Sequence, residues 1–133
     1  MPGYTGGCHC GQVRFEFTAP KALQAKACNC SICERVGFLH LFFAKPDFRL
    51  LTQWEHLSVY TFNSGVAQHW FCPTCGVKSF YRPRSHPTGY SVNARCLDGV
   101  ELSEIQISPF DGRNWEANVG QLAPLPDSLS DSS

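Results

Sequence analysis

The chain has 133 residues, enough for one domain with a single hydrophobic core and too few for two. Eleven Lys and Arg residues balance eleven Asp and Glu residues, and 43% of the chain is hydrophobic. A chain without net charge has no global field to attract nucleic acid or an anionic membrane surface. The composition therefore argues against both as partners and favours small molecules or proteins.

The predicted compartment decides how the cysteines are interpreted. Residues 1–7 lack a signal-peptide pattern, and the longest apolar stretch, 38–44, is far shorter than the roughly 20 residues needed to span a bilayer. We therefore expect a soluble, cytoplasmic protein. Thiols stay reduced in the cytosol, so eight cysteines, seven of them in C-x-C or C-x-x-C spacings, favour metal thiolates over disulfides.

The first predicted element is a strand over 12–17, where apolar and polar residues alternate. Cys8 and Cys10 precede this strand. Residues two apart share a face of an extended segment, so both sulfurs can reach one ion. Taken alone, the pair can also be two unrelated buried cysteines.

The second cysteine group is a trio. Residues 20–26 predict a bend or a short irregular edge, and Cys28, Cys30 and Cys33 follow with C-x-C-x-x-C spacing. Loops this short let all three sulfurs bind one metal ion. The trio is one ligand short of a structural zinc site, whereas a catalytic zinc keeps one position open. A helical turn ending at Gly37 is expected after the trio.

The rest of the chain predicts an all-β sheet fold. An apolar strand over 38–44 contains His40, which we expect to be a hydrogen-bonded core residue rather than a ligand. Further short strands are predicted over 48–51, 57–62, 67–71, 78–82, 90–94 and 105–107, with a hairpin turn at 63–65.

A C-P-x-C-G knuckle carries the third cysteine group. Its proline and glycine favour a turn whose amides point at the sulfurs of Cys72 and Cys75. A four-ligand zinc site needs a second pair of cysteines besides Cys72 and Cys75, and Cys8 with Cys10 is the available pair. The economical partition is a closed four-cysteine site and an open three-cysteine site. Spacing alone does not exclude a pairing of Cys8 and Cys10 with two members of the trio.

These motifs resemble a known family. The three cysteine groups in this order, with 11–16 and 71–76, look like the glutathione-dependent formaldehyde-activating enzyme family, over residues 6–116. Stretches most similar to its centromere protein V branch are 60–63, 67–69, 79–81, 83–85 and 96–98.

The resemblance implies a fold and two metal sites. It implies a mainly β, zinc-bearing domain of the type of methionine sulfoxide reductase B and a guanine-nucleotide-exchange chaperone. The Pro, Ser and Asp residues of 122–133 predict a flexible tail, so we place the domain at 1–121. The resemblance implies two Zn²⁺ ions per chain. The structural ion would be held by Cys8, Cys10, Cys72 and Cys75, and the catalytic ion by Cys28, Cys30 and Cys33.

The resemblance also implies an activity. Family members condense glutathione with formaldehyde, so a zinc-dependent carbon–sulfur lyase acting on a glutathione or other thiol adduct is expected. Arg35, Arg82 and Arg84 are candidates for binding glutathione carboxylates, although solvent-facing roles fit them equally. One alternative is a non-catalytic zinc module that binds a protein partner. A third makes Cys96 a redox nucleophile, although we expect Cys96 to be a buried thiol.

Overall fold

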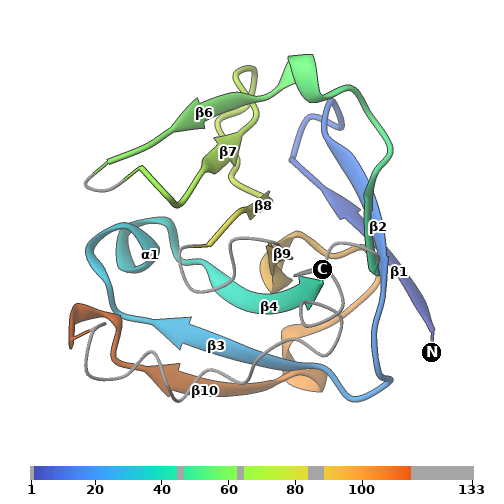
Figure 1. Cartoon of the computed structure of the whole chain (residues 1–133). Coiled ribbons are helices and arrows are strands. Elements are labelled where there is room, and N and C mark those ends of the chain that lie inside the picture. The colour runs from blue at the N-terminus through green and yellow to red at the C-terminus, as the bar shows by residue number, and fades with distance from the viewer. Residues whose placement is uncertain (1, 45–46, 63–64, 84–88, 115–133) are drawn as a thin grey trace, which may run out of the picture.

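A computed structural model describes residues 2–44, 47–62, 65–83 and 89–114, and this part of the chain is mainly β (Figure 1). The strands are β1 Gly3–Gly7, β2 Arg14–Thr18, β3 Gln24–Cys28, β4 Leu39–Ala44, β5 Phe48–Leu50, β6 Ser58–Tyr60, β7 His69–Phe71, β8 Phe80–Tyr81, β9 Gly89–Asn93 and β10 Gln106–Phe110. The helix α1 covers Ser31–Val36, and short 3-10 turns cover η2 Trp54–His56, η3 Ala94–Cys96, η4 Leu102–Glu104 and η5 Gly112–Asn114. No helix within these residues is long and apolar enough to cross a membrane.

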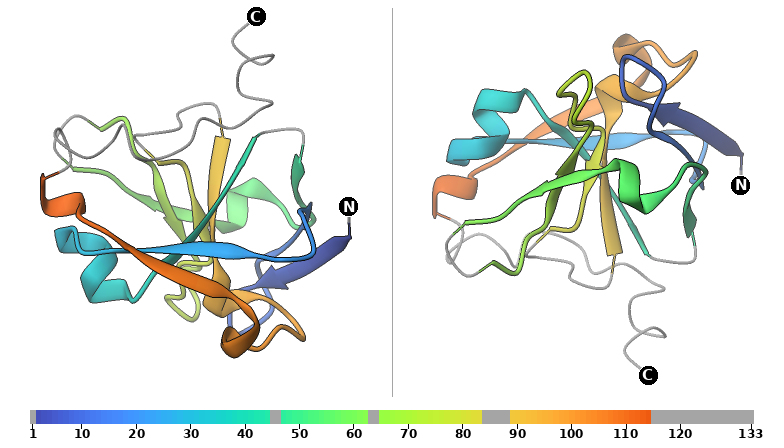
Figure 2. Two further views of the ribbon diagram at one scale, coloured as in Figure 1. Left: turned by 90° about the horizontal axis from the view of Figure 1, so that it is seen from below. Right: turned by 90° about the horizontal axis from the view of Figure 1, so that it is seen from above.

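The central sheet has five strands in the order β10-β3-β4-β9-β8. Its strands are antiparallel except for the parallel pair of β10 and β3, which run side by side toward α1 and η5 (Figure 2). A second sheet has the order β1-β2-β5, and β6 pairs with β7. Because Cys28 is the register partner of Phe110, the parallel pair brings the turn η5 close to the start of the cysteine trio.

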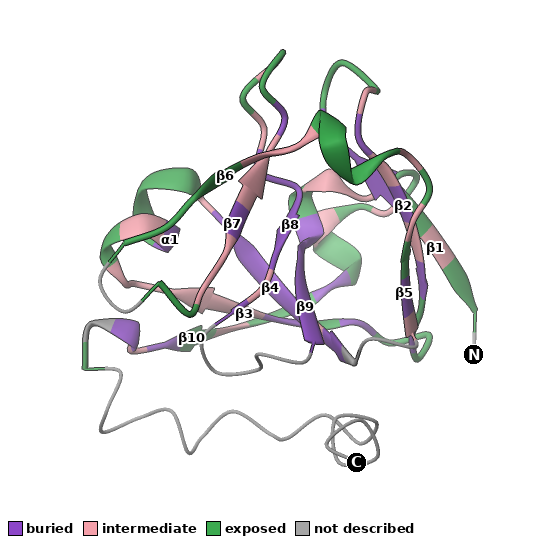
Figure 3. Cartoon of the chain, turned by 45° about the horizontal axis from the view of Figure 1, so that its top comes forward, coloured by how far each residue is buried: buried purple, intermediate pink, exposed green. Residues whose placement is uncertain are grey.

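Aromatic side chains fill the core between the sheets. Phe15 packs on Phe48 and Phe80, with ring centres 5.5 Å and 5.9 Å apart, and Phe17 packs on Phe43 at 4.4 Å. Residues on β4, β8 and β9 are mostly buried, while β6 lies near the surface (Figure 3). Phe15 and Phe17 are at most 2% exposed, which confirms the buried face predicted from the alternation.

Most predicted strands are present, but the segment before the trio differs from the expectation. Residues 24–28 form β3, an interior strand between β10 and β4, rather than a bend or an irregular edge. Ala and Lys have low strand propensity, so local sequence does not indicate β structure here. The strand forms because β3 pairs with β10 on one side and with β4 on the other. The hairpin turn expected at 63–65 lies partly outside the described residues.

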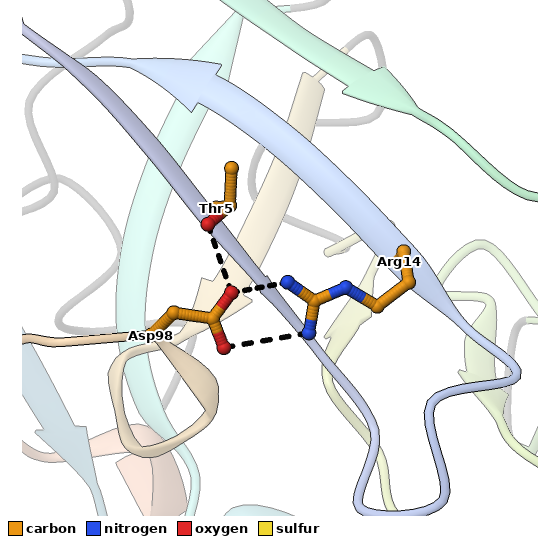
Figure 4. A network of polar contacts seen from close by, with 3 residues as sticks. All are labelled: Thr5, Arg14 and Asp98. Atoms are coloured by element: carbon orange, nitrogen blue, oxygen red, sulfur yellow. Dashed lines mark hydrogen bonds and ion pairs between the residues drawn. The ribbon is translucent and has the colours of Figure 1, made fainter.

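A polar network holds the turn that carries Cys8 and Cys10. The guanidinium of Arg14 on β2 donates to both carboxylate oxygens of Asp98, and Thr5 Oγ1 on β1 donates to Asp98 Oδ2 at 2.8 Å (Figure 4). Hydrogen bonds from Arg14 and Thr5 lower the pKa of the Asp98 carboxyl. The network therefore fixes β1 and β2 on either side of this turn.

Candidate metal centres

Four cysteines from distant parts of the chain form the first cluster: Cys8, Cys10, Cys72 and Cys75. Their Sγ atoms all lie within 4.8 Å of one another. Cys10 Sγ is 3.7 Å from Cys8 Sγ and 3.6 Å from Cys72 Sγ. Two sulfurs bound to a tetrahedral zinc lie about 3.8 Å apart, given a Zn–S bond of about 2.3 Å. The spacing and the all-thiol donor set therefore fit Zn²⁺.

The two halves of the first cluster are tied together beside the sulfurs. The Gly76 N–H donates to the Cys72 carbonyl at 2.8 Å, and Gly76 takes φ +78°, so the knuckle turns as its sequence predicts. Across the cluster, Thr74 Oγ1 donates to Gln12 Oε1 at 2.6 Å. This contact joins the turn after β1 to the turn after β7.

The second cluster comprises Cys28, Cys30 and Cys33. Cys28 ends β3, Cys30 is the N-cap of α1, and Cys33 lies in α1. Hydrogen bonds from the thiols of Cys28 and Cys33 lower the pKa of Cys30 to about 2, and the Cys33 N–H donates to Cys30 Sγ at 3.4 Å. Cys30 thus contacts both other thiols of the trio, but the donor atoms that all lie within 4.8 Å of one another are those of Cys28, Cys33 and His40.

A histidine lies against the second cluster. Donor atoms of Cys28, Cys33 and His40 lie within 4.8 Å of one another, and His40 Nε2 is 3.1 Å from Cys33 Sγ. His40 Nδ1 is 2.9 Å from Ser91 Oγ and 3.4 Å from the Tyr81 hydroxyl. Burial lowers the pKa of His40 to about 3, so its imidazole is neutral. His40 is a hydrogen-bonded core residue, as predicted, and it also reaches the sulfurs.

A buried lysine interacts electrostatically with the second cluster. Lys78 is 6% exposed, and its Nζ lies 2.6 Å from His69 Nδ1 and 4.0 Å from the centre of the Tyr81 ring. No carboxylate of the described residues lies within ion-pair distance of this nitrogen. Burial lowers the pKa of Lys78 to about 8, while the charges of Cys33 and Cys30 oppose that change.

Gly112 is a site residue that the sequence analysis missed. A Cβ atom at this position would lie 2.3 Å from Cys28 Sγ and 3.1 Å from Cys30 Cβ. The turn that carries Gly112 is anchored by Asn29 Nδ2, which donates to Asp111 Oδ1 at 3.1 Å. A side chain at position 112 would overlap the Cys28 sulfur, so this position requires glycine. No local sequence motif indicates that role for Gly112.

A cavity of about 610 Å³ lies between α1 and the end of β6, next to the second cluster in sequence. It is lined by Ser31, Ile32, Arg35, Val36, Tyr60 and Phe62. Among the candidate arginines, Arg35 lies on its wall. Arg82 instead lies over the rings of Trp70 and Tyr90, at 5.5 Å and 5.8 Å from their centres. Arg84 lies outside the described residues.

Cys96 belongs to neither cluster within the described part of the chain. Its side chain is half-buried, and burial raises the pKa of the thiol to about 11. A thiol with a raised pKa is a poor nucleophile near neutral pH. These observations give the redox hypothesis for Cys96 no support.

Comparisons with known proteins match the family that the cysteine pattern resembles. The family described as "Glutathione-dependent formaldehyde-activating enzyme" matches residues 3–111. A Halomonas elongata protein, placed provisionally among such enzymes by its name, is 30% identical over 78 residues, which cover 53% of this chain and 50% of that protein. The chain thus spans about half the length of this curated relative. A crystal structure of a Rhodobacter sphaeroides protein is 36% identical with a TM-score of 0.69, covering 78% of this chain and 99% of that chain.

Proposed function

The chain belongs to the glutathione-dependent formaldehyde-activating enzyme family, and from this membership we propose that it is a zinc-dependent carbon–sulfur lyase. Its substrate class is the adduct of a thiol, such as glutathione, with an aldehyde, such as formaldehyde. The observation that carries the proposal is a cluster of three thiols at the start of α1, a helix that also lines a cavity of about 610 Å³.

The two clusters suit different tasks. The first cluster offers four sulfurs, which saturate a tetrahedral ion and make a structural site. The second cluster offers three cysteines, so the fourth position of a tetrahedral ion is available to another donor. Its helix α1 also contributes Ser31 and Ile32 to the cavity wall, directly after Cys30. The cavity wall is therefore continuous in sequence with the trio, and the three cysteines themselves are not among its lining residues.

The proposed reaction forms a C–S bond and an O–H bond, breaks the S–H bond and the carbonyl π bond, and needs no oxidant or reductant. The thiol sulfur attacks the aldehyde carbon, the carbonyl π electrons move to oxygen, and the proton lost by the thiol ends on that oxygen. A zinc ion held by Cys28, Cys30 and Cys33 would supply stabilisation of thiolate at neutral pH. The reverse direction releases the aldehyde and the thiol from the adduct.

The chain's own side chains would orient the thiol substrate. Glutathione carries two carboxylates, and the Arg35 guanidinium on the cavity wall has the planar geometry that binds a carboxylate with two hydrogen bonds. Tyr60 and Phe62 also line this cavity and would offer their aromatic rings to a bound ligand. Arg84 and Arg82 stay candidates for the second carboxylate.

The test combines metal content with turnover. Purified protein should hold two zinc ions per chain and accelerate the formation of S-hydroxymethylglutathione from glutathione and ¹³C-formaldehyde, followed by NMR exchange spectroscopy. Cys30→Ser should remove one zinc and lower the rate roughly 10-fold or more, because a direct ligand matters at least as much as an outer-shell partner. Cys96→Ser is the matched control, and it should keep both ions and the rate.

Two results would contradict the proposal. One zinc per chain, with an unchanged rate in Cys30→Ser, would show that the second cluster takes no part. Two zinc ions with no turnover of any thiol adduct would instead favour the non-catalytic zinc module.

A further inference from the structure

We infer that His40 binds the metal ion of the second cluster through its Nε2 atom, together with Cys28 and Cys33. This inference rests on the proposed zinc site at Cys28, Cys30 and Cys33. It assigns a metal-binding role to a residue that the cysteine motif does not contain.

The first argument is distance. His40 Nε2 lies 3.1 Å from Cys33 Sγ, and the donor atoms of His40, Cys33 and Cys28 all lie within 4.8 Å of one another. An imidazole nitrogen and a sulfur bound to one tetrahedral zinc lie about 3.6 Å apart, from bond lengths of about 2.05 Å and 2.3 Å. The two atoms would have to separate by only about 0.5 Å to share an ion.

The second argument is the orientation of the ring. His40 Nδ1 faces Ser91 Oγ at 2.9 Å, and the Tyr81 hydroxyl lies 3.4 Å away. When Nδ1–H donates to the Ser91 oxygen, the lone pair of Nε2 points at the sulfurs. Metal-binding histidines in proteins almost always donate their other N–H to such a partner. The surrounding groups thus hold the ring in the form that binds a metal.

The third argument is rigidity. His40 is 3% exposed and Ser91 is fully buried. His40 lies in β4, which pairs with β3 on one side and with β9 on the other. β3 delivers Cys28 and β9 delivers Ser91, so the same sheet positions the imidazole, one sulfur and the supporting hydroxyl. The ring therefore needs no rearrangement of the backbone to reach the cluster.

A site that includes His40 has a consequence for the proposed reaction. Cys28, Cys33 and His40 would fill three positions of a tetrahedral ion, and the fourth would be shared in turn by Cys30, whose sulfur lies outside this group, and a substrate thiol. The competing arrangement is a hydrogen bond in which Nε2–H donates to the Cys33 sulfur. It keeps His40 in the core and makes no metal–nitrogen bond, so the two arrangements differ in one measurable contact.

The experiment reads that contact directly in the folded protein. Chain labelled with ¹⁵N-histidine is loaded with ¹¹³Cd²⁺ in place of zinc and studied by ¹¹³Cd NMR. We expect two cadmium resonances, one of them split by coupling to a single imidazole nitrogen. The coupling should vanish in His40→Gln and persist in His69→Gln, which alters the other buried histidine of the described residues. Ser91→Ala should weaken the affinity of the second site about 10- to 100-fold in chelator competition.

The outcomes separate this inference from the proposed function. Two resonances without nitrogen coupling in the wild type would overturn the role of His40 and leave the three-cysteine site in place. A single resonance, from the first cluster alone, would overturn both. The wild-type spectrum decides the question even if His40→Gln does not fold.

Discussion

Lys78 gives the sharpest quantitative prediction, because a lysine is buried here without a carboxylate partner in the described part of the chain. Its pKa falls from 10.5 to about 8, chiefly through burial. At 1.36 kcal/mol per pKa unit, this difference corresponds to about 3 kcal/mol. Holding the charged form in the interior costs the folded state this free energy at neutral pH.

The sign of the pH dependence follows from proton binding. Between pH 8 and pH 10.5 the unfolded chain keeps a proton on Lys78 that the folded chain has lost. The unfolded state binds more protons, so the free energy of unfolding rises with pH across this window. Below pH 8 both states are protonated and the full penalty is present. From pH 7 to pH 10, Lys78 should raise the stability by about 2.5 kcal/mol.

Lys78→Met removes the titrating group while keeping a long side chain. We expect the variant to be more stable than wild type at pH 7 by up to about 3 kcal/mol, and the gap to shrink by about 2.5 kcal/mol at pH 10. The measurement is guanidinium unfolding followed by Trp fluorescence, at one fixed free zinc concentration because bound metal shifts apparent stability. Lys21→Met, at an exposed lysine, is the control and should change stability by less than about 0.5 kcal/mol at either pH. Parallel pH profiles for wild type and Lys78→Met would refute the reasoning.

Two further predictions address the metal sites separately. Gly112→Ala places a methyl group 2.3 Å from Cys28 Sγ, so it should weaken the metal affinity of the second cluster roughly 10-fold or more and leave that of the first cluster unchanged. Gly3→Ala is the control, because a Cβ at Gly3 has no atom within 4 Å, and it should alter neither affinity. Both affinities are measured by chelator competition. Cys72→Ser should abolish the cooperative thermal transition seen by circular dichroism, because structural zinc contributes about 10–16 kcal/mol in small zinc domains and the whole stability of a domain is about 5–15 kcal/mol. Equal metal affinities in the two glycine variants, or a melting curve of Cys72→Ser like that of wild type, would contradict these expectations.

The sequence predicts the parts of the site that depend on short spacing. The C-x-C, C-x-x-C and C-P-x-C-G patterns place sulfurs within reach of one another because the intervening loops are short. The grouping of Cys8 and Cys10 with Cys72 and Cys75 is different, since it joins segments about 60 residues apart. Spacing left that pairing open, and only the resemblance and then the fold specify it.

Residues that act through tertiary pairing escape sequence analysis. Gly112 approaches Cys28 because β10 and β3 are parallel neighbours, and β3 itself was not predicted. Lys78 was predicted on a strand, but a lysine in a strand is ordinarily solvated. Nothing in the neighbouring sequence therefore indicates that Lys78 is buried. His40 was predicted in the core from its apolar neighbours. Its contact with Cys33 depends on where α1 returns to the sheet.

The two clusters are connected through one short segment of chain. The knuckle of the first cluster joins β7 to β8, and residues on either side of it are His69, Lys78 and Tyr81. The Tyr81 hydroxyl contacts His40, and Lys78 interacts with the charges of the trio. A metal at the first cluster would hold the segment 69–81 in place. Buried side chains of this segment lie next to the second cluster. The four-cysteine site would therefore support the chemistry of the trio through the position of these three side chains, without taking part in it.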